Sequence, residues 1–337
     1  MTFASVWGEF ALCVGLIGIA GSKLSRYGDV IAEKTGLSRT WIGLVLLATV
    51  TSLPELTTGI SSVALADSPN IALGDVLGSC VFNLSIIVIL DFLHRGESVY
   101  TRAGHGHILS AGFGIVLIGF VGFNVLLAGH GASFSIGHVG VSTPIIIVLY
   151  GIAMLTVFRY ERRQMAAFTE EVARRYPDVT LRQALFRYAV AALVVVGAGT
   201  WLPFVGGQMA QVMGWHQTFV GTLFVAFATS VPEVVVTVAA FRIGALDMAI
   251  GNLLGSNLFD ILIVAVDDLF FLRGPILSHV SPLHAVSALS AVMMTGVAVV
   301  GLLYRPKTRL FKTVGWISLL LFSLYLLNAY VLYIYGE

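Results

Sequence analysis

The sequence predicts an all-α polytopic membrane protein with about ten transmembrane helices, arranged as two inverted five-helix repeats with broken helices at the midplane. Three observations predict this fold: the composition, the length of the apolar runs and an internal repeat. Hydrophobic residues make up 57% of the 337 residues and charged residues only 11%, whereas soluble domains contain about 25% charged residues. Apolar runs of about 20 residues, which are long enough to cross a bilayer as helices, recur along the chain.

The candidate transmembrane segments are separated by short breaks that are polar or contain Gly or Pro. The ten segments cover approximately residues 5–22, 39–65, 70–93, 106–129, 139–158, 184–205, 217–241, 246–272, 281–303 and 312–334. The first segment lacks a preceding basic region and a following small-residue cleavage site, so we interpret it as a span and not as a signal peptide. Cys13 and Cys80 lie in apolar segments without the spacing of metal ligands, so we expect no disulfide or zinc site.

The basic residues predict the orientation. If the N-terminus is placed outside, every Lys and Arg except Arg273 falls in an inside loop or at an inside helix end, as the positive-inside rule requires. Both termini are then external, and the charged segment 159–183 is a cytoplasmic linker between the first repeat, 1–158, and the second, 184–337. We expect an integral protein of the prokaryotic cell (inner) membrane.

Two blocks of sequence recur in the same order in the two halves. Residues 43–56, GLVLLATVTSLPEL, align with 221–234, GTLFVAFATSVPEV, and residues 74–84, GDVLGSCVFNL, align with 251–261, GNLLGSNLFDI. Each repeat contains five predicted spans, an odd number, so the second copy crosses the membrane in the opposite direction. Inverted repeats are typical of secondary transporters, whose substrate site lies near the midplane where the halves meet.

Each repeat places one glutamate in an apolar span, at equivalent positions. An ionisable group inside the bilayer, such as Glu55 or Glu233, marks an ion or substrate path by default. Oxygen-bearing side chains four residues apart share a helix face with these acids or with each other in the following spans. The pairs are Thr51 with Glu55, Thr229 with Glu233, Ser79 with Asn83, and Ser256 with Asp260.

Prolines add backbone oxygens to this set. Pro54 has no N–H for the carbonyl of Val50, and Pro232 has none for the carbonyl of Ala228. Broken backbone at membrane depth is tolerated where it is buried in protein or lines a wet cavity. All of these groups are hard oxygen donors, which suit Ca²⁺ or several Na⁺ ions and not soft or histidine-preferring metals.

The paired glutamates suggest how transport is coupled. Two carboxylates close together at low dielectric repel each other, and one would tend to protonate. A divalent ion, Na⁺ ions or protons each relieve that repulsion, and these occupants exclude one another. Mutual exclusion at one site, combined with alternating access, amounts to antiport.

The doubled motif resembles that of the cation/calcium exchanger superfamily, in particular the compact prokaryotic sodium/calcium exchangers. The family pattern is G-T-S-[LV]-P-E followed by G-[ND]-x-x-G-S-x-x-x-[ND]. This chain has VTSLPEL with GDVLGSCVFN, and ATSVPEV with GNLLGSNLFD. The resemblance covers nearly the whole chain, because the ten-span inverted topology and the central cytoplasmic loop also agree.

The resemblance implies particular ion sites. It implies Ca²⁺ between Glu55 and Glu233, helped by Thr51 and Thr229. It implies Na⁺ sites among Ser52, Ser79, Asn83, Ser230, Ser256 and Asp260, with backbone carbonyls near Ala48 and Ala226. The Gly that usually precedes T-S is Val50 in the first copy and Ala228 in the second, and both departures bear on ion selectivity and carbonyl geometry.

Three further acids lie near span ends. Asp91 and Asp268 occupy equivalent repeat positions, and Asp267 adds a neighbour on the same helical face as Asp260. A proton relay or ion vestibule is one interpretation of these residues. We favour the other, that they are helix-end polar groups near the membrane interface.

The function predicted is a secondary active cation antiporter that exchanges Ca²⁺ for Na⁺ by alternating access. A proton-driven Ca²⁺/cation antiporter and a passive cation channel are the alternatives; a channel needs neither paired acids nor inverted halves. We expect no enzymatic activity, because Ser52 near Glu55 lacks the His partner of a hydrolase. The expected partners are inorganic cations and the lipid bilayer, with no cofactor and no nucleic acid; K⁺ co-transport and the oligomeric state are left open.

Overall fold

The computed structural model describes residues 2–35, 50–94, 98–104, 106–165, 178–242, 244–306, 309–310 and 314–335. Within these residues, eight helices are long and apolar enough to cross a membrane. A bent helix pair, Gln217–Thr229 with Val231–Arg242, brings the number to nine if it counts as one span. The protein is therefore an all-α, multi-pass membrane protein, as the sequence predicts.

The helices follow the predicted spans closely. In chain order they are α1 (Phe3–Thr35), α3 (Leu53–Ala64), α4 (Pro69–Leu93), α5 (Val99–Arg102), α6 (Gly106–Gly129), α7 (Ser142–Met165), α8 (Leu181–Met213), α9 (Gln217–Val220), α10 (Ala226–Thr229), α11 (Val231–Arg242), α12 (Leu246–Phe270), α13 (His284–Tyr304) and α14 (Trp316–Tyr335). A π-helical segment, η1 (Gly221–Val225), joins α9 to α10, and a 3-10 turn, η2 (Ile276–Ser278), follows α12. The first part of the predicted span 39–65, up to residue 49, lies outside the described residues.

Two helices, α1 and α8, are much longer than their predicted spans, and α8 covers Leu181–Met213 where the prediction was 184–205. The first predicted span ends at residue 22, but α1 continues to Thr35. Leu24 and Val30 are fully buried, and Leu24 belongs to an apolar cluster with Ala191 of α8. Buried apolar residues therefore continue the helix beyond the predicted span.

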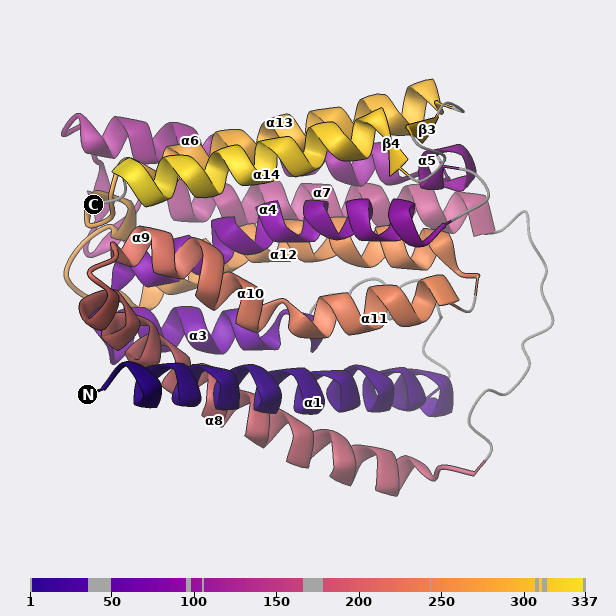
Figure 1. Ribbon diagram of the computed structural model, residues 1–337, viewed down its shortest axis with the longest axis horizontal. Coiled ribbons are helices and arrows are strands. Elements are labelled where there is room, and N and C mark those ends of the chain that lie inside the picture. The colour runs from indigo at the N-terminus through magenta and orange to yellow at the C-terminus, as the bar shows by residue number, and fades with distance from the viewer. Residues whose placement is uncertain are drawn as a thin grey trace.

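The helices form one bundle with two ends (Figure 1). Helices α1 and α8 pack together along one edge, α6, α13 and α14 lie along the opposite edge, and α3, α4, α10, α11 and α12 lie between them. We call the end at which α1 begins and α14 ends the terminal face. The opposite end, at which α7 ends and α8 begins, is the linker face.

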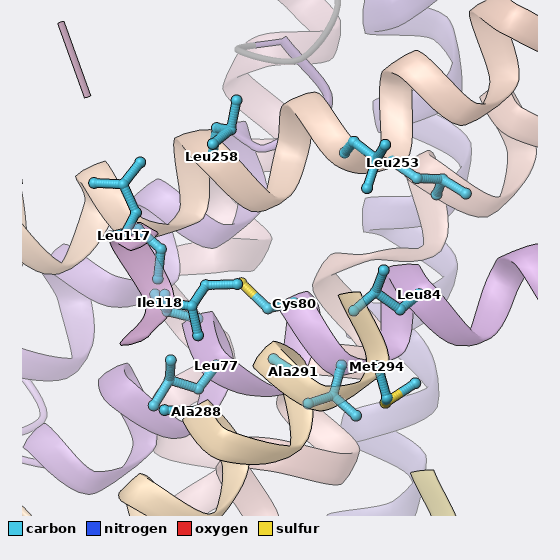
Figure 2. Close-up of a cluster of buried hydrophobic side chains, with 14 of the residues drawn as sticks. Leu77, Cys80, Leu84, Leu117, Ile118, Leu253, Leu258, Ala288, Ala291 and Met294 are labelled. Atoms are coloured by element: carbon cyan, nitrogen blue, oxygen red, sulfur yellow. The ribbon is translucent and has the colours of Figure 1, made fainter. Parts of the chain in front are cut away.

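An apolar core fixes the two central helices, α4 and α12. Figure 2 shows Leu77 of α4 near Ile118 of α6, and Leu84 of α4 near Met294 of α13; Leu258 of α12 belongs to the same cluster. All five side chains are buried. Since protein interiors are close-packed, this cluster holds α4 and α12 against the outer helices and so positions the polar residues on their other faces.

Two short hairpins precede the last helix of each half. Strands β1 (Ser135–Ile136) and β2 (Val139–Gly140) pair antiparallel before α7, and β3 (Arg309–Leu310) and β4 (Val314–Gly315) pair antiparallel before α14. Asp268, near the end of α12, accepts hydrogen bonds from the Gly140 N–H at 2.8 Å and the Ile276 N–H at 2.7 Å. It also accepts one from the Thr143 hydroxyl. This carboxylate therefore fastens α12 to the hairpin of the other half.

Asp91 repeats this arrangement near the end of α4. One of its oxygens accepts from the Gly315 N–H and the Ser318 hydroxyl, each at 2.8 Å. The other accepts from the Ser98 hydroxyl and the Val99 N–H, each at 3.2 Å. Both aspartates thus have the contacts expected of structural helix-end groups.

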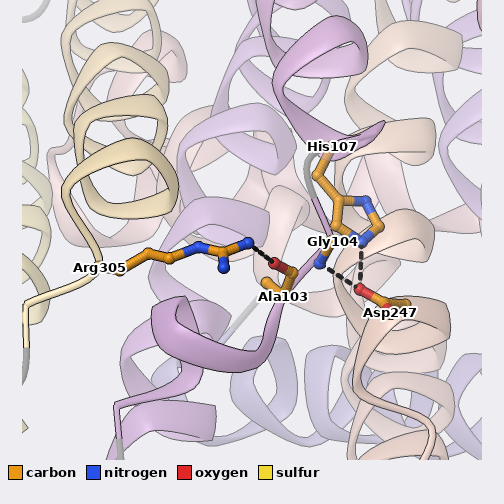
Figure 3. Close-up of polar contacts among 5 residues, drawn as sticks. All are labelled: Ala103, Gly104, His107, Asp247 and Arg305. Atoms are coloured by element: carbon orange, nitrogen blue, oxygen red, sulfur yellow. Dashed lines mark hydrogen bonds and ion pairs between the residues drawn. The ribbon is translucent and has the colours of Figure 1, made fainter.

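A third acid fastens α12 at the linker face (Figure 3). Asp247 accepts from the Gly104 N–H at 2.7 Å and pairs with the His107 ring at 2.9 Å. Nearby, the Arg305 guanidinium donates to the Ala103 carbonyl at 3.1 Å. These contacts connect the start of α12 and the end of α13 to the α5–α6 turn.

Candidate functional site

Two helix breaks lie at the centre of the bundle, at the repeated T-S-x-P-E motif. Ser230 ends α10 with φ −81° and ψ 4°, and Ser52 precedes α3 with φ −87° and ψ 14°. Both values fall in the sparsely allowed bridge region. The axis bends by 46° between α10 and α11. The break follows from Pro54 and Pro232, which cannot donate to the preceding turn.

The two breaks are joined by crossed hydrogen bonds between the halves. The Ser52 hydroxyl donates to Oε1 of Glu233 at 3.3 Å, and the Ser230 hydroxyl donates to Oε1 of Glu55 at 3.3 Å. Each serine therefore reaches the glutamate of the opposite repeat. The Glu233 carboxylate also interacts electrostatically with those of Glu55 and Asp260, so the acids of the two halves converge.

Hydroxyls from α4 and α12 also contact these serines and glutamates. Ser230 contacts the Ser79 hydroxyl at 3.1 Å. Ser256 donates to Oε1 of Glu233 at 3.4 Å and lies 3.5 Å from the Thr51 hydroxyl. The structure thus brings together Glu55, Glu233, Thr51, Ser52, Ser79, Ser230 and Ser256. The sequence spacing placed Thr51 beside Glu55 on one helix, whereas the observed contact of Thr51 crosses to the other half.

Glycines let the backbones approach closely enough for these contacts. A Cβ at Gly74 would lie 3.0 Å from the Gly221 Cα, and a Cβ at Gly78 would overlap the Thr222 carbonyl. Helix α4 therefore packs backbone to backbone against η1, which places Ser79 beside Ser230.

Asp75 is a buried acid that our site prediction omitted. The Thr229 hydroxyl donates to Oδ1 of Asp75 at 2.8 Å, so Thr229 pairs with this aspartate. Asp75 interacts electrostatically with Glu55. The available signal was the second position of G-[ND]-x-x-G-S, which is an acid in the first repeat and Asn252 in the second.

Asn83 and Asp260 lie next to a second layer of contacts between α4 and α12. Asn83 donates to the Asn257 side-chain oxygen at 3.0 Å, and Asn257 donates to the Cys80 carbonyl at 3.1 Å. The Cys80 thiol lies 3.9 Å from Oδ2 of Asp260. Cys80 and Asn257, which occupy equivalent repeat positions, were also absent from the predicted site.

The candidate backbone oxygens differ in availability. The Ala226 carbonyl accepts the Ser230 N–H at 3.0 Å and the Thr229 hydroxyl at 3.2 Å. Val50 and Ala228 are buried, and the prolines that follow them cannot bond to their carbonyls. Ala48 lies outside the described residues.

The central acids keep spare oxygens although they are fully buried. Glu55 is 1% exposed and Glu233 is 0% exposed. Oε2 of each glutamate and Oδ1 of Asp260 have no hydrogen-bond partner. Across the described residues, no three His, Cys, Asp or Glu side chains form a metal-binding group. A cation bound here would therefore need hydroxyl and carbonyl oxygens as well as carboxylates, which is the donor chemistry of Ca²⁺ and Na⁺.

Apolar helices that surround a buried, oxygen-rich centre define the chain as a multi-pass membrane transport protein. The particular family follows from sequence comparison. The chain belongs to the sodium/calcium exchanger protein family, because the family's sequence model matches residues 5–164 and 184–333. This family consists of ion exchangers and not of enzymes.

The chain is also similar to individual relatives and to solved structures. The inner membrane protein YrbG of Escherichia coli is 26% identical over 258 residues, which cover 75% of this chain and 76% of that protein. The sodium/calcium exchanger MaX1 of Methanosarcina acetivorans is 26% identical over 276 residues, 73% of this chain and 77% of that protein. The sodium-calcium exchanger NCX_Mj, soaked with 2.5 mM Na⁺ and 0.1 mM Ca²⁺, has a similar fold with a TM-score of 0.61 and 21% identity, covering 98% and 99% of the two chains.

Proposed function

We propose that this protein is a secondary antiporter that exchanges Ca²⁺ for Na⁺ by alternating access at the Glu55–Glu233 centre. The two halves, 1–158 and 184–337, would supply one glutamate each. Membership of the sodium/calcium exchanger family supports the ions, and the oxygen-rich centre supports the site.

The observation that carries the proposal is the crossed pair of serine–glutamate hydrogen bonds. Each pair satisfies one oxygen of a glutamate and leaves Oε2 without a partner. Leaving a buried charge unpaired is costly, so a bound cation would stabilise this centre. One Ca²⁺ or more than one Na⁺ supplies that charge, and the two kinds of ion would compete for the same oxygens.

Alternating access would use the same contacts. Ser52 and Ser230 belong to opposite halves, and so do the acids they contact. Movement of one half against the other would therefore break these hydrogen bonds and open the glutamates to solvent on one side of the membrane at a time. Broken helices at the site of contact are the usual construction of such transporters.

A proton-driven cation antiporter is the second candidate. Five buried acids, Glu55, Asp75, Glu233, Asp260 and Asp267, each keep one oxygen without a hydrogen-bond partner. Protonation would remove the charge of such a carboxylate, and a bound cation would offset it. Val50 and Ala228, which replace the usual Gly before T-S, would alter selectivity between these coupling ions.

The proposed location is the prokaryotic cell membrane with both termini outside. The terminal face would then be external and the linker face cytoplasmic. The distribution of Lys and Arg, all of which except Arg273 fall on the inner side in this orientation, supports it.

Uptake of ⁴⁵Ca²⁺ into proteoliposomes tests the proposal. Vesicles are loaded in turn with Na⁺, with Na⁺ plus K⁺, or at low pH, and diluted into buffer without the loaded ion. We expect uptake to require the outward Na⁺ gradient and to stop when a Na⁺ ionophore dissipates it. Uptake driven only by the proton gradient would favour the second candidate, and uptake without any gradient would favour a channel.

A further inference from the structure

The polar residues of the central site are not symmetric between the repeats. Asp75 corresponds to Asn252, and Asp260 corresponds to Asn83. When the alignment of 74–84 with 251–261 continues without a gap, Asp267 corresponds to Leu90. Three acids therefore have uncharged counterparts in the opposite repeat.

The inverted directions of the two helices place these acids at the same end. Helix α4 runs from the terminal face to the linker face, and α12 runs the opposite way (Figure 1). Asp75 precedes Ser79 on α4, and Asp267 lies two turns beyond Asp260 on α12. Both acids therefore lie on the terminal-face side of the central hydroxyls. The uncharged residues Asn252 and Leu90 occupy the mirrored positions toward the linker face.

Helix α3 leaves room for the Asp267 carboxylate. A Cβ placed on Gly59 would lie 2.5 Å and 2.6 Å from the two oxygens of Asp267. Gly59 is four residues beyond Glu55, on the same face of α3. The Asp267 side chain is 1% exposed, and its Oδ1 has no hydrogen-bond partner. A buried acid thus points at the glutamate-bearing helix, one turn from Glu55, with an unused oxygen.

Asp75 links Asp267 to the central site. Its side chain is 0% exposed, its Oδ1 accepts the Thr229 hydroxyl, and its Oδ2 has no partner. The Asp75 carboxylate interacts electrostatically with both Glu55 and Asp267. Two buried carboxylates with unused oxygens therefore lie on the same side of the central hydroxyls and interact with each other.

We propose that Asp75 and Asp267 bind a second Ca²⁺ ion on the terminal-face side of Glu55, separate from the central ion. This inference rests on the proposed function for its choice of ion. Carboxylates are hard ligands that Ca²⁺ prefers, and a divalent ion would offset the cost of burying both charges without partners. The mirrored amide and leucine provide no such ligands, so the second site exists at one end only.

Equilibrium binding of ⁴⁵Ca²⁺ to the purified, full-length protein in detergent tests the second site. We expect two Ca²⁺ ions per chain in the wild type and one in the Asp267→Asn and Asp75→Asn variants. The matched control is Asp247→Asn, which removes an acid at the linker-face end of the same helix α12 and should leave two ions bound. Size-exclusion profiles confirm that each variant is folded.

The number of Ca²⁺ ions bound per chain distinguishes a side chain that binds Ca²⁺ directly from one that attracts it from a distance. If Asp267 acted only through its field, its removal would weaken Ca²⁺ binding without changing the number of ions, and that result would overturn the second site. One ion per wild-type chain would overturn it as well. Because the proteoliposome assay is performed on the same preparations, Na⁺-driven uptake alongside a single bound ion would reject the second site and leave the proposed exchange standing.

Discussion

Buried carboxylates occur in two settings in this protein, and they differ in how their oxygens are used. Asp91 and Asp268, near the ends of α4 and α12, accept four and three hydrogen bonds respectively. Glu55 and Glu233, at the centre of the bundle, each leave Oε2 without a partner. All four side chains are at most 2% exposed, so burial does not distinguish the two settings.

The difference shows how to separate a structural acid from a functional one. A buried acid whose oxygens are saturated by backbone N–H groups is a fixed part of the fold, because those donors would otherwise be unsatisfied. A buried acid with a spare oxygen is expensive in the empty protein and becomes favourable only with a positive charge beside it. The helix-end aspartates therefore contribute to stability, and the central glutamates are suited to a transported ion.

The strongest test of this contrast is to neutralise the central acids. Glu55→Gln and Glu233→Gln keep the shape and remove the charge that a cation needs. Removing one partner of a buried charge pair costs about 3–5 kcal/mol, so apparent Ca²⁺ affinity should fall by at least about 100-fold. Uptake of ⁴⁵Ca²⁺ driven by a Na⁺ gradient measures this loss.

The same variants should remain folded. Glutamine retains an oxygen that can accept from Ser52 or Ser230, and the repulsion between the two carboxylates is removed. We expect thermal unfolding midpoints in detergent equal to or above that of the wild type. Wild-type uptake in either variant would place the transport site elsewhere.

Neutralising the helix-end aspartates should produce the opposite pattern. In Asp91→Asn, the amide nitrogen would face donors such as the Gly315 N–H or the Val99 N–H, leaving them unsatisfied. A buried donor without a partner costs about 1–3 kcal/mol, so we expect a lower thermal midpoint in detergent. Asp268→Asn should lower the thermal midpoint in the same way, since the N–H groups of Gly140 and Ile276 donate to Asp268 as those of Gly315 and Val99 donate to Asp91.

Uptake by the folded protein distinguishes the aspartate variants from the glutamate variants. Uptake per folded molecule of the Asp91 and Asp268 variants should equal that of the wild type, once folded protein is quantified by size exclusion. Loss of uptake without loss of stability would instead assign these aspartates to the ion path, as the relay interpretation holds.

The fold was predictable from sequence because membrane helices are dictated by local composition. The predicted span 106–129 matches α6, Gly106–Gly129, and the predicted 217–241 matches the bent segment that ends at Arg242. Helix α1 was predicted too short, because hydropathy detects the apolar part of a helix, whereas α1 continues past the polar residues with Leu24 and Val30 buried.

The candidate site was predictable as a set of residues but not as a set of contacts. Repeated motifs identified the glutamates and serines, since each half carries its own copy. The pairing of Ser52 with Glu233 depends on where the opposite half packs, which no local pattern encodes. Asp75 was not predicted, and its partner, the Thr229 hydroxyl, belongs to the opposite half, so this contact too is encoded by no local pattern.

The crossed serines give the finest test of the contrast between spare and saturated oxygens. Ser52→Ala and Ser230→Ala each remove one donor to a glutamate of the opposite half. At 3.3 Å these hydrogen bonds are long, so each loss should cost about 1 kcal/mol, or roughly fivefold in apparent Ca²⁺ affinity. The Ser230 variant should show the larger change, because that hydroxyl also contacts Ser79. Ser62→Ala is the matched control on α3, since the Ser62 hydroxyl donates to the Thr58 carbonyl of its own helix. The apparent Ca²⁺ affinity measured from uptake should be highest for the wild type and Ser62→Ala, lower for Ser52→Ala and lowest for Ser230→Ala. Equal affinities for all four proteins would show that the crossed hydrogen bonds do not hold the glutamates in place.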